Sequence, residues 1–228
     1  MKAQQPSRSI ALGQQAFSSQ KLYIFCDMKE QKKKSLEKAI KAFPRGRVFS
    51  IREIRIPINN DAIRQGLKRL TDKGIIRRAK RGFFERPVFS KFLQETLETD
   101  MQKMAESLAK NNNWTIAPTG NTALNLLGLS TQTPATWTFV SDGPYKTYNI
   151  NGKILKFKHR ANKDISGISP KSNLVIQALK SLKQEETTPE AIEKIRKQLS
   201  PEEKKKILVE SSFTTQRIYD SIKKICEG

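Results

Sequence analysis

Cysteine and histidine are scarce in this sequence, and their scarcity excludes several kinds of site. The 228 residues contain two cysteines, Cys26 and Cys226, and one histidine, His159. Two cysteines near opposite ends do not form the pattern of a disulfide framework, and they supply too few ligands for a four-ligand zinc site. A single histidine excludes every two-histidine metal motif. We therefore expect no metal and no cofactor.

Signatures of catalysis are also missing. The chain has no GxxxxGK[ST] or GxGxxG stretch to cradle phosphates, and no GxSxG elbow to present a nucleophilic serine. His159 follows a predicted strand, where a structural role is the commoner one. Asp142 and Asp164 could join a metal site, but a turn explains Asp142 equally well. We expect no catalytic residue and no enzyme.

Long apolar runs are absent as well. No stretch approaches the roughly 20 residues that a membrane helix needs. Ile10-Ala11-Leu12 is too short for the core of a secretory signal, so we expect a cytoplasmic protein. Residues 1–20 lack a periodic apolar face, and we expect residues 1–28 to be a flexible extension. Met28 remains an alternative start to Met1.

Acidic residues are outnumbered by basic ones almost two to one. The chain has 43 Lys and Arg against 22 Asp and Glu, a net charge of +21 and a pI near 10.1. Such a surplus favours a polyanionic partner, and nucleic acid is the default. An anionic membrane surface is the weaker alternative, because the sequence has no basic amphipathic anchor with bulky aromatic residues.

The positive charge is concentrated between Arg45 and Pro87. This segment contains thirteen basic and four acidic residues, a net charge of +9. Within this segment, residues 50–53 form a capping box, S-x-x-E, which predicts a short helix. Residues 59–61, Asn-Asn-Asp, predict the start of a second helix. Its predicted buried face comprises Ile63, Leu67 and Leu70. Gly74 is a typical left-handed cap at its end.

A β-hairpin is predicted directly after this second helix. Residues 75–78 have strand propensity, residues 79–82 resemble a tight turn, and residues 83–85 resemble the returning strand. A helix over residues 30–43 and a short strand at residues 48–49 precede these elements. The order predicts a winged helix-turn-helix over residues 29–88. A basic helix and hairpin that only face solvent is the alternative.

The predicted nucleic-acid contacts fall into two groups. Arg64, Gln65 and Lys68 are expected to face the major groove, with Asn59 and Asn60 at the helix N-terminus near phosphate or base. The hairpin is expected to hold the backbone or the minor groove. The full set of predicted DNA-binding residues is Asn59, Asn60, Arg64, Gln65, Lys68, Arg69, Arg77, Arg78, Lys80 and Arg81.

The remainder of the chain predicts a small α/β domain at residues 89–160 and a helical region at residues 161–228. Residues 89–113 have the apolar periodicity of one long helix. Asn151-Gly152 predicts a two-residue turn that pairs Ile150 with Lys153 and Tyr148 with Leu155. At three places in residues 161–228 a Ser or Thr directly precedes a Pro. These pairs predict helix starts at residues 170, 189 and 201. The predicted fold class is therefore α+β.

Two segments resemble a known family. Residues 77–87, RRAKRGFFERP, are similar to the wing of AbiEi-type antitoxins, which belong to type IV abortive-infection toxin–antitoxin systems. Residues 117–123, APTGNTA, and residues 126–134, LLGLSTQTP, resemble second-domain motifs of a winged-helix subgroup of that family. The resemblance covers about residues 30–160.

The resemblance implies a bacterial DNA-binding antitoxin that represses its own operon, aids defence against phage, and counteracts a nucleotidyltransferase-fold toxin, for which direct contact is not required. Three alternatives remain open at this stage. They are a stand-alone transcription regulator with a ligand- or partner-binding second domain, an RNA-binding antitoxin or adaptor, and a nuclease accessory or divergent enzyme.

Overall fold

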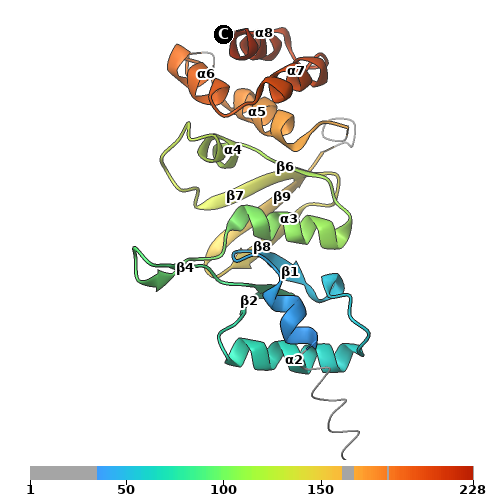
Figure 1. Cartoon of the computed structure of the whole chain (residues 1–228). Helices are drawn as coiled ribbons and strands as arrows, with labels where there is room; N and C mark the ends of the chain where they lie inside the picture. The colour runs from blue at the N-terminus through green and yellow to red at the C-terminus, as the bar shows by residue number, and fades with distance from the viewer. Residues whose placement is uncertain (1–34, 161–166, 184, 228) are drawn as a thin grey trace, which may run out of the picture. The chain divides into compact units, whose positions relative to one another are not determined.

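The computed structural model describes residues 35–160, 167–183 and 185–227. They form a mixed α+β protein of two compact units, divided between Glu98 and Thr99 (Figure 1). The predictions for residues 1–28, for Cys26 and Met28, for Asp164 and for the start of the first helix lie outside the described residues. In the described part, none of the helices is both long and apolar enough to cross a membrane.

Unit 1 combines helices with a three-stranded antiparallel sheet. Residues 35–41 are helical and lead into β1 (Val48–Ser50) and the short 3-10 helix η1 (Ile51–Glu53). Helix α2 (Asn60–Asp72) is followed by β2 (Arg77–Lys80) and β3 (Phe83–Glu85). The strand order is β1-β3-β2, with a bulge between Arg78 and Lys80. The short strand at residues 48–49 and the existence of the hairpin are thus confirmed, but its first strand is at residues 77–80 rather than 75–78.

The core of unit 1 matches the predicted apolar faces. Ile63, Leu67 and Leu70 of α2 are buried together with Leu36 and Ile40 of the preceding helix. At Gly66 a Cβ atom would lie 2.2 Å from Cδ2 of Leu36, so any side chain at this position would force Leu36 to move. Because helix residues three and four apart share a face, the spacing alone identified this core.

The segment from Phe89 to Asn113 is not the single helix that was predicted. β4 (Phe89–Ser90) and β5 (Glu95–Thr96) pair as an antiparallel hairpin, and α3 (Met101–Asn112) begins only afterwards. The Asp100 carboxylate accepts hydrogen bonds from the backbone N–H groups of residues 102 and 103. Phe92, expected on a buried helical face, is 94% exposed. Apolar periodicity was misleading because it carried no information about this cap.

Unit 2 is built on a mixed four-stranded sheet. Its strands are β6 (Ile116–Pro118), β7 (Thr136–Ser141), β8 (Lys146–Ile150) and β9 (Lys153–His159), in the order β6-β7-β9-β8. Only β7 and β9 are parallel. Helix α4 (Asn121–Leu126) connects β6 to β7. Figure 1 shows α3 lying across one face of this sheet.

The β8–β9 hairpin has the predicted register. Tyr148 lies opposite Leu155 and Ile150 opposite Lys153. Asn151 and Gly152 both have positive φ, at 51° and 86°. A two-residue Asn-Gly turn requires positive φ at both positions, so these angles are those of the predicted turn. The turn fixes the register of the two strands that it joins.

The C-terminal helices are α5 (Pro170–Ser181), α6 (Pro189–Arg196), α7 (Pro201–Glu210) and α8 (Gln216–Cys226). Each of the first three has the predicted proline in its first turn. α7 also has the predicted capping box between Ser200 and Glu203. Leu127, just after α4, is buried in the same apolar core as these helices. Figure 1 shows α5 to α8 packed against one another.

Candidate nucleic-acid interface

Helix α2 has one face in the core and one in solvent. The Asn59 side chain accepts a hydrogen bond of 2.8 Å from the Ala62 N–H and so caps the helix start. Because the apolar positions point inward, the polar positions between them are left outside. The exposed polar residues of α2 include Asn60, Arg64, Gln65, Lys68 and Arg69.

The β2–β3 hairpin presents a second basic surface. Arg78 and Arg81 are exposed, and Lys80 is partly exposed. Gly82 allows the tight turn, with φ of 84°, a conformation that side chains disfavour. Phe84 points inward and packs in the core of unit 1. The hairpin thus keeps its apolar residues inside and exposes Arg78 and Arg81.

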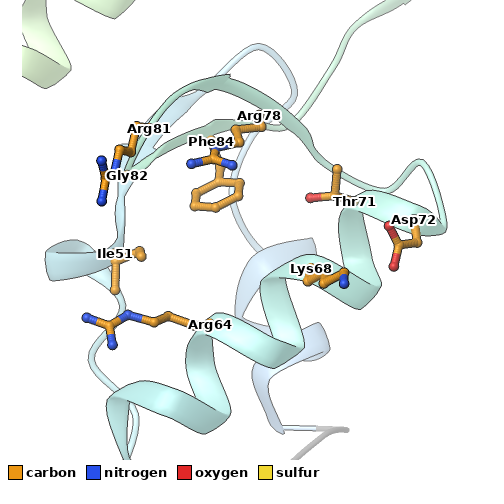
Figure 2. Close-up of a pocket in the computed structure, with 9 residues that line it drawn as sticks. All are labelled: Ile51, Arg64, Lys68, Thr71, Asp72, Arg78, Arg81, Gly82 and Phe84. Atoms are coloured by element: carbon orange, nitrogen blue, oxygen red, sulfur yellow. The ribbon is translucent and has the colours of Figure 1, made fainter.

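These two basic surfaces meet at one groove of about 690 Å³. Figure 2 shows α2 along one side, the hairpin along the other, and the Phe84 ring between them. The residues that line the groove are Ile51, Arg64, Lys68, Thr71, Asp72, Arg78, Arg81, Gly82 and Phe84. The structure therefore brings together four of the ten predicted DNA contacts.

The charge of the groove is strongly positive. Four cationic residues, two from α2 and two from the hairpin, line it together with a single acid, Asp72. Arg64 forms an ion pair of 3.1 Å with Asp61, but both side chains are largely exposed, so solvent weakens this contact. An anionic ligand would face cations on both sides of the groove, an arrangement suited to a phosphate backbone.

Arg77, although predicted as a DNA contact, is engaged within the protein. Its Nη2 lies 2.7 Å from Oε2 of Glu85, a carboxylate that is only 2% exposed, and also donates to the Leu97 carbonyl. Similarly, Arg86 donates to the carbonyls of Lys41 and Phe43. Part of the charge excess of residues 45–87 therefore stabilises unit 1 itself.

The other predicted contacts lie outside the groove lining. Asn59 is used as the helix cap, and Asn60 is exposed in the first turn. Gln65 and Arg69 are exposed on α2 and stand beside Arg64 and Lys68 in sequence. Lys80 lies in β2 at the bulge, between the two groove arginines. Ile51, Thr71 and Phe84 also line the groove and were not predicted, because only the packing of the hairpin against the helix brings them to this surface.

Metal binding or nucleophilic chemistry would depend on the surroundings of clustered acidic residues, His159 and Cys226. Within the described ranges, no cluster of three or more His, Cys, Asp or Glu residues could hold a metal ion. His159 lies at the end of β9, with Nδ1 3.0 Å from the Gly143 carbonyl oxygen. Burial raises the pKa of the Cys226 thiol, which disfavours the thiolate form that a nucleophile or metal ligand requires.

Comparison with known proteins identifies one family. A family model described as a family of unknown function (DUF6088) matches residues 35–207, and the match includes the groove of unit 1 and the sheet of unit 2. Among curated proteins, none matches the chain. Because the match spans well over half of the sequence, the chain belongs to the DUF6088 family.

Proposed function

We propose that unit 1 is a winged helix-turn-helix and that the protein binds duplex DNA. The order helix, β1, η1, α2, β2, β3 and the strand order β1-β3-β2 support this proposal. In such domains one helix enters the major groove. The main observation is the groove in which Arg64 and Lys68 of α2 meet Arg78 and Arg81 of the hairpin.

The dimensions of α2 suit this role. Its 13 residues correspond to a helix about 20 Å long. A helix with side chains is about 10–12 Å across, and the major groove of B-DNA is about 12 Å wide. With the buried side of α2 held by the core, its polar side is the one available to base edges.

The two sides of the groove would have different tasks. Arg64, Gln65 and Lys68 on the helix would read base edges, since Arg and Lys bind guanine and Gln binds adenine. Arg78 and Arg81 on the hairpin would bind phosphates, which position the protein without reading the sequence. Asn60 and the α2 N-terminus offer a further phosphate contact.

We propose further that the DNA is the operator of the protein's own operon and that the protein is an antitoxin in the cytoplasm. This part rests on the similarity of residues 77–87 and 117–134 to AbiEi-type antitoxins. Their toxins have a nucleotidyltransferase fold. Co-expression with such a toxin from a neighbouring reading frame tests the idea, since growth should recover only when this chain is present.

The DNA-binding proposal is tested by replacing the hairpin arginines. Arg78→Ala/Arg81→Ala should weaken binding to specific and non-specific duplexes alike, because it removes phosphate contacts. Each phosphate contributes about 0.9 to the slope of log affinity against log salt, so the slope should fall by about 2. Arg64→Ala should instead reduce the preference for operator over random DNA by about 5- to 150-fold, equivalent to about 1–3 kcal/mol. Fluorescence anisotropy over a salt series measures both.

The matched control is Lys38→Ala/Lys91→Ala. Both lysines are exposed in unit 1 and lie outside the groove. This variant also loses two positive charges, so it reveals the effect of net charge alone. Equal affinity losses in the two double variants would refute a specific role for the groove. Stronger binding to RNA than to any duplex would point to the RNA-binding alternative.

A ligand-sensing regulator is a second candidate, and one observation favours it. Unit 2 contains a cavity of about 330 Å³ beside α3, lined in part by Gln102, Glu106, Trp114 and Phe139. Its mixture of aromatic and polar side chains suits a small molecule. A metabolite that raised the melting temperature of the wild type but not of Trp114→Ala would support this candidate.

A further inference from the structure

Unit 2 has a basic region of its own on strands β8 and β9. Residues 144–160 contain no Asp or Glu. They contain five cationic side chains, Lys146, Lys153, Lys156, Lys158 and Arg160. Lys146 and Lys153 fall on the face of the strands that carries Leu155 and Phe157, whereas Lys156 and Lys158 fall on the opposite face. An excess of positive charge without acidic neighbours in sequence favours an anionic partner.

Strand β9 separates its apolar and basic residues onto opposite faces. Leu155 and Phe157 are fully buried, whereas the alternate residues Lys156 and Lys158 are exposed. Ile154, on the same face as these lysines, is 41% exposed. Because alternate residues of a strand lie about 6.6 Å apart, this face presents its cations in a regular row.

Four of the five cations have no acidic partner within the described part of the chain. Lys146, Lys156, Lys158 and Arg160 form no ion pair with any residue that the structure describes. By contrast, most lysines and arginines of α6 and α7 have acidic residues within a helical turn, including the Arg196–Glu193 pair at 2.7 Å. The basic row on β9 is therefore a distinct electrostatic feature of unit 2.

The row is held on a rigid support. A Cβ atom at Gly143 would lie 2.4 Å from the Trp114 ring, so the turn before β8 packs tightly against this side chain. The Asp142 carboxylate accepts a hydrogen bond of 2.9 Å from the Thr115 N–H. Strand β9 itself is paired on both sides, with β7 and with β8. Because the backbone is already fixed, only the side chains have to be ordered on binding.

We infer that this face, formed by Lys156 and Lys158 of β9 and by Arg160 directly after the strand, binds the phosphate backbone of duplex DNA that flanks the segment bound by unit 1. This inference rests on the proposed function. Residues 97–100, which separate β5 from α3, span at most about 14 Å even when fully extended. Once unit 1 is on DNA, unit 2 is therefore at high effective concentration beside the same duplex.

Lys156→Gln/Lys158→Gln in the full chain tests the inference. Its control, Lys180→Gln/Lys205→Gln, removes the same charge from exposed helical positions of unit 2. Both are titrated against a short operator duplex that only unit 1 covers and against a duplex extended on both sides. We expect the β9 variant to bind the extended duplex about tenfold more weakly than wild type, with a salt slope lower by about 2. The control should stay within about twofold.

Several outcomes are distinguishable. Loss of affinity for the extended duplex alone supports the inference. Equal losses in the β9 variant and the control overturn it, as does a loss confined to RNA. If wild type binds no duplex at all, the proposed function itself fails. Circular dichroism and thermal melting check that Lys156→Gln/Lys158→Gln is folded, and Lys158→Arg, which keeps the charge, should retain wild-type binding.

Discussion

Single arginines of the β2–β3 hairpin have opposite roles although they lie within five residues of each other. Arg77 pairs with a buried carboxylate, whereas Arg81 lines an open groove. Both residues look alike in sequence, as members of the basic run RRAKR. Their roles differ because β2 directs one side chain towards Glu85 and the turn directs the other towards solvent. Mutation should separate stability from binding at these two positions.

Arg77→Ala should destabilise unit 1 by about 3 kcal/mol, because it leaves the Glu85 carboxylate buried without its ion pair. Chemical denaturation measures this loss. Arg81→Ala is the comparison and should stay within about 0.5 kcal/mol of wild type, as is usual for exposed positions. If Arg77→Ala kept full stability while losing DNA affinity, Arg77 would belong with the binding residues.

Glu210 makes one part of the stability of unit 2 depend on pH. Its carboxylate accepts hydrogen bonds from the N–H and hydroxyl of Ser169, at 3.1 and 2.7 Å. Burial acts to raise its pKa, but hydrogen bonds from Ser172 and Ser169, together with the charge of Lys206, outweigh burial and lower the pKa. The carboxylate of α7 thereby caps the start of α5, which has no side-chain cap of its own.

A lowered pKa means that the ionised form stabilises the fold. This contribution is present above the carboxyl's unfolded value of about 4.3 and is lost as pH falls through the folded value. Glu210→Gln should therefore cost about 1–2 kcal/mol at pH 7 and should flatten the loss of melting temperature below about pH 4.5. Glu202→Gln, an exposed position on the same helix, should leave the wild-type pH profile unchanged. A wild-type profile in Glu210→Gln would refute this role.

At the scale of elements, the contact between α2 and the preceding helix limits which residues fit at position 66. Gly66 lies where the helix over residues 35–41 approaches α2, and Leu36 occupies the space beside it. An alanine there gains helix propensity, worth about 1 kcal/mol, but forces a buried leucine to move. Packing should outweigh propensity, because Leu36 is only 2% exposed.

Gly66→Ala should consequently lower the stability of unit 1 by about 1–2 kcal/mol, measured by thermal or urea unfolding. Gln65→Ala, one position away on the exposed face, makes a small gain in propensity, because Gln is already a good helix former, and creates no clash. It should be neutral or slightly stabilising. A Gly66→Ala variant more stable than wild type would show that Leu36 moves at little cost.

Elements were predictable where a local signal settles the backbone. Asn151-Gly152, the Ser200 capping box and the apolar faces of α2 are confirmed because each depends on neighbouring residues only. The long helix predicted from residue 89 was wrong, because its apolar residues fit helical spacing while Gln94, with φ of 54°, and the Asp100 cap required a hairpin and a later start.

At the scale of the whole molecule, the net charge of +21 predicts a polyanionic partner but not its location. The structure places three groups of these basic residues in different environments. Some, such as Arg77 and Arg86, stabilise unit 1 through internal contacts. Others gather at the groove of unit 1, and a third group forms the row on β9.

Sequence alone determined the α+β class, the buried helical faces of unit 1, the register of the β8–β9 hairpin and the order of helix and hairpin, because these follow from periodicity, capping and turn chemistry among near neighbours. Only the tertiary structure decided which cations share a surface. Arg64 and Arg81 are 17 positions apart and line one groove, while Arg77 is drawn to Glu85. Side chains distant in sequence meet through strand pairing and core packing, and no local pattern encodes that meeting.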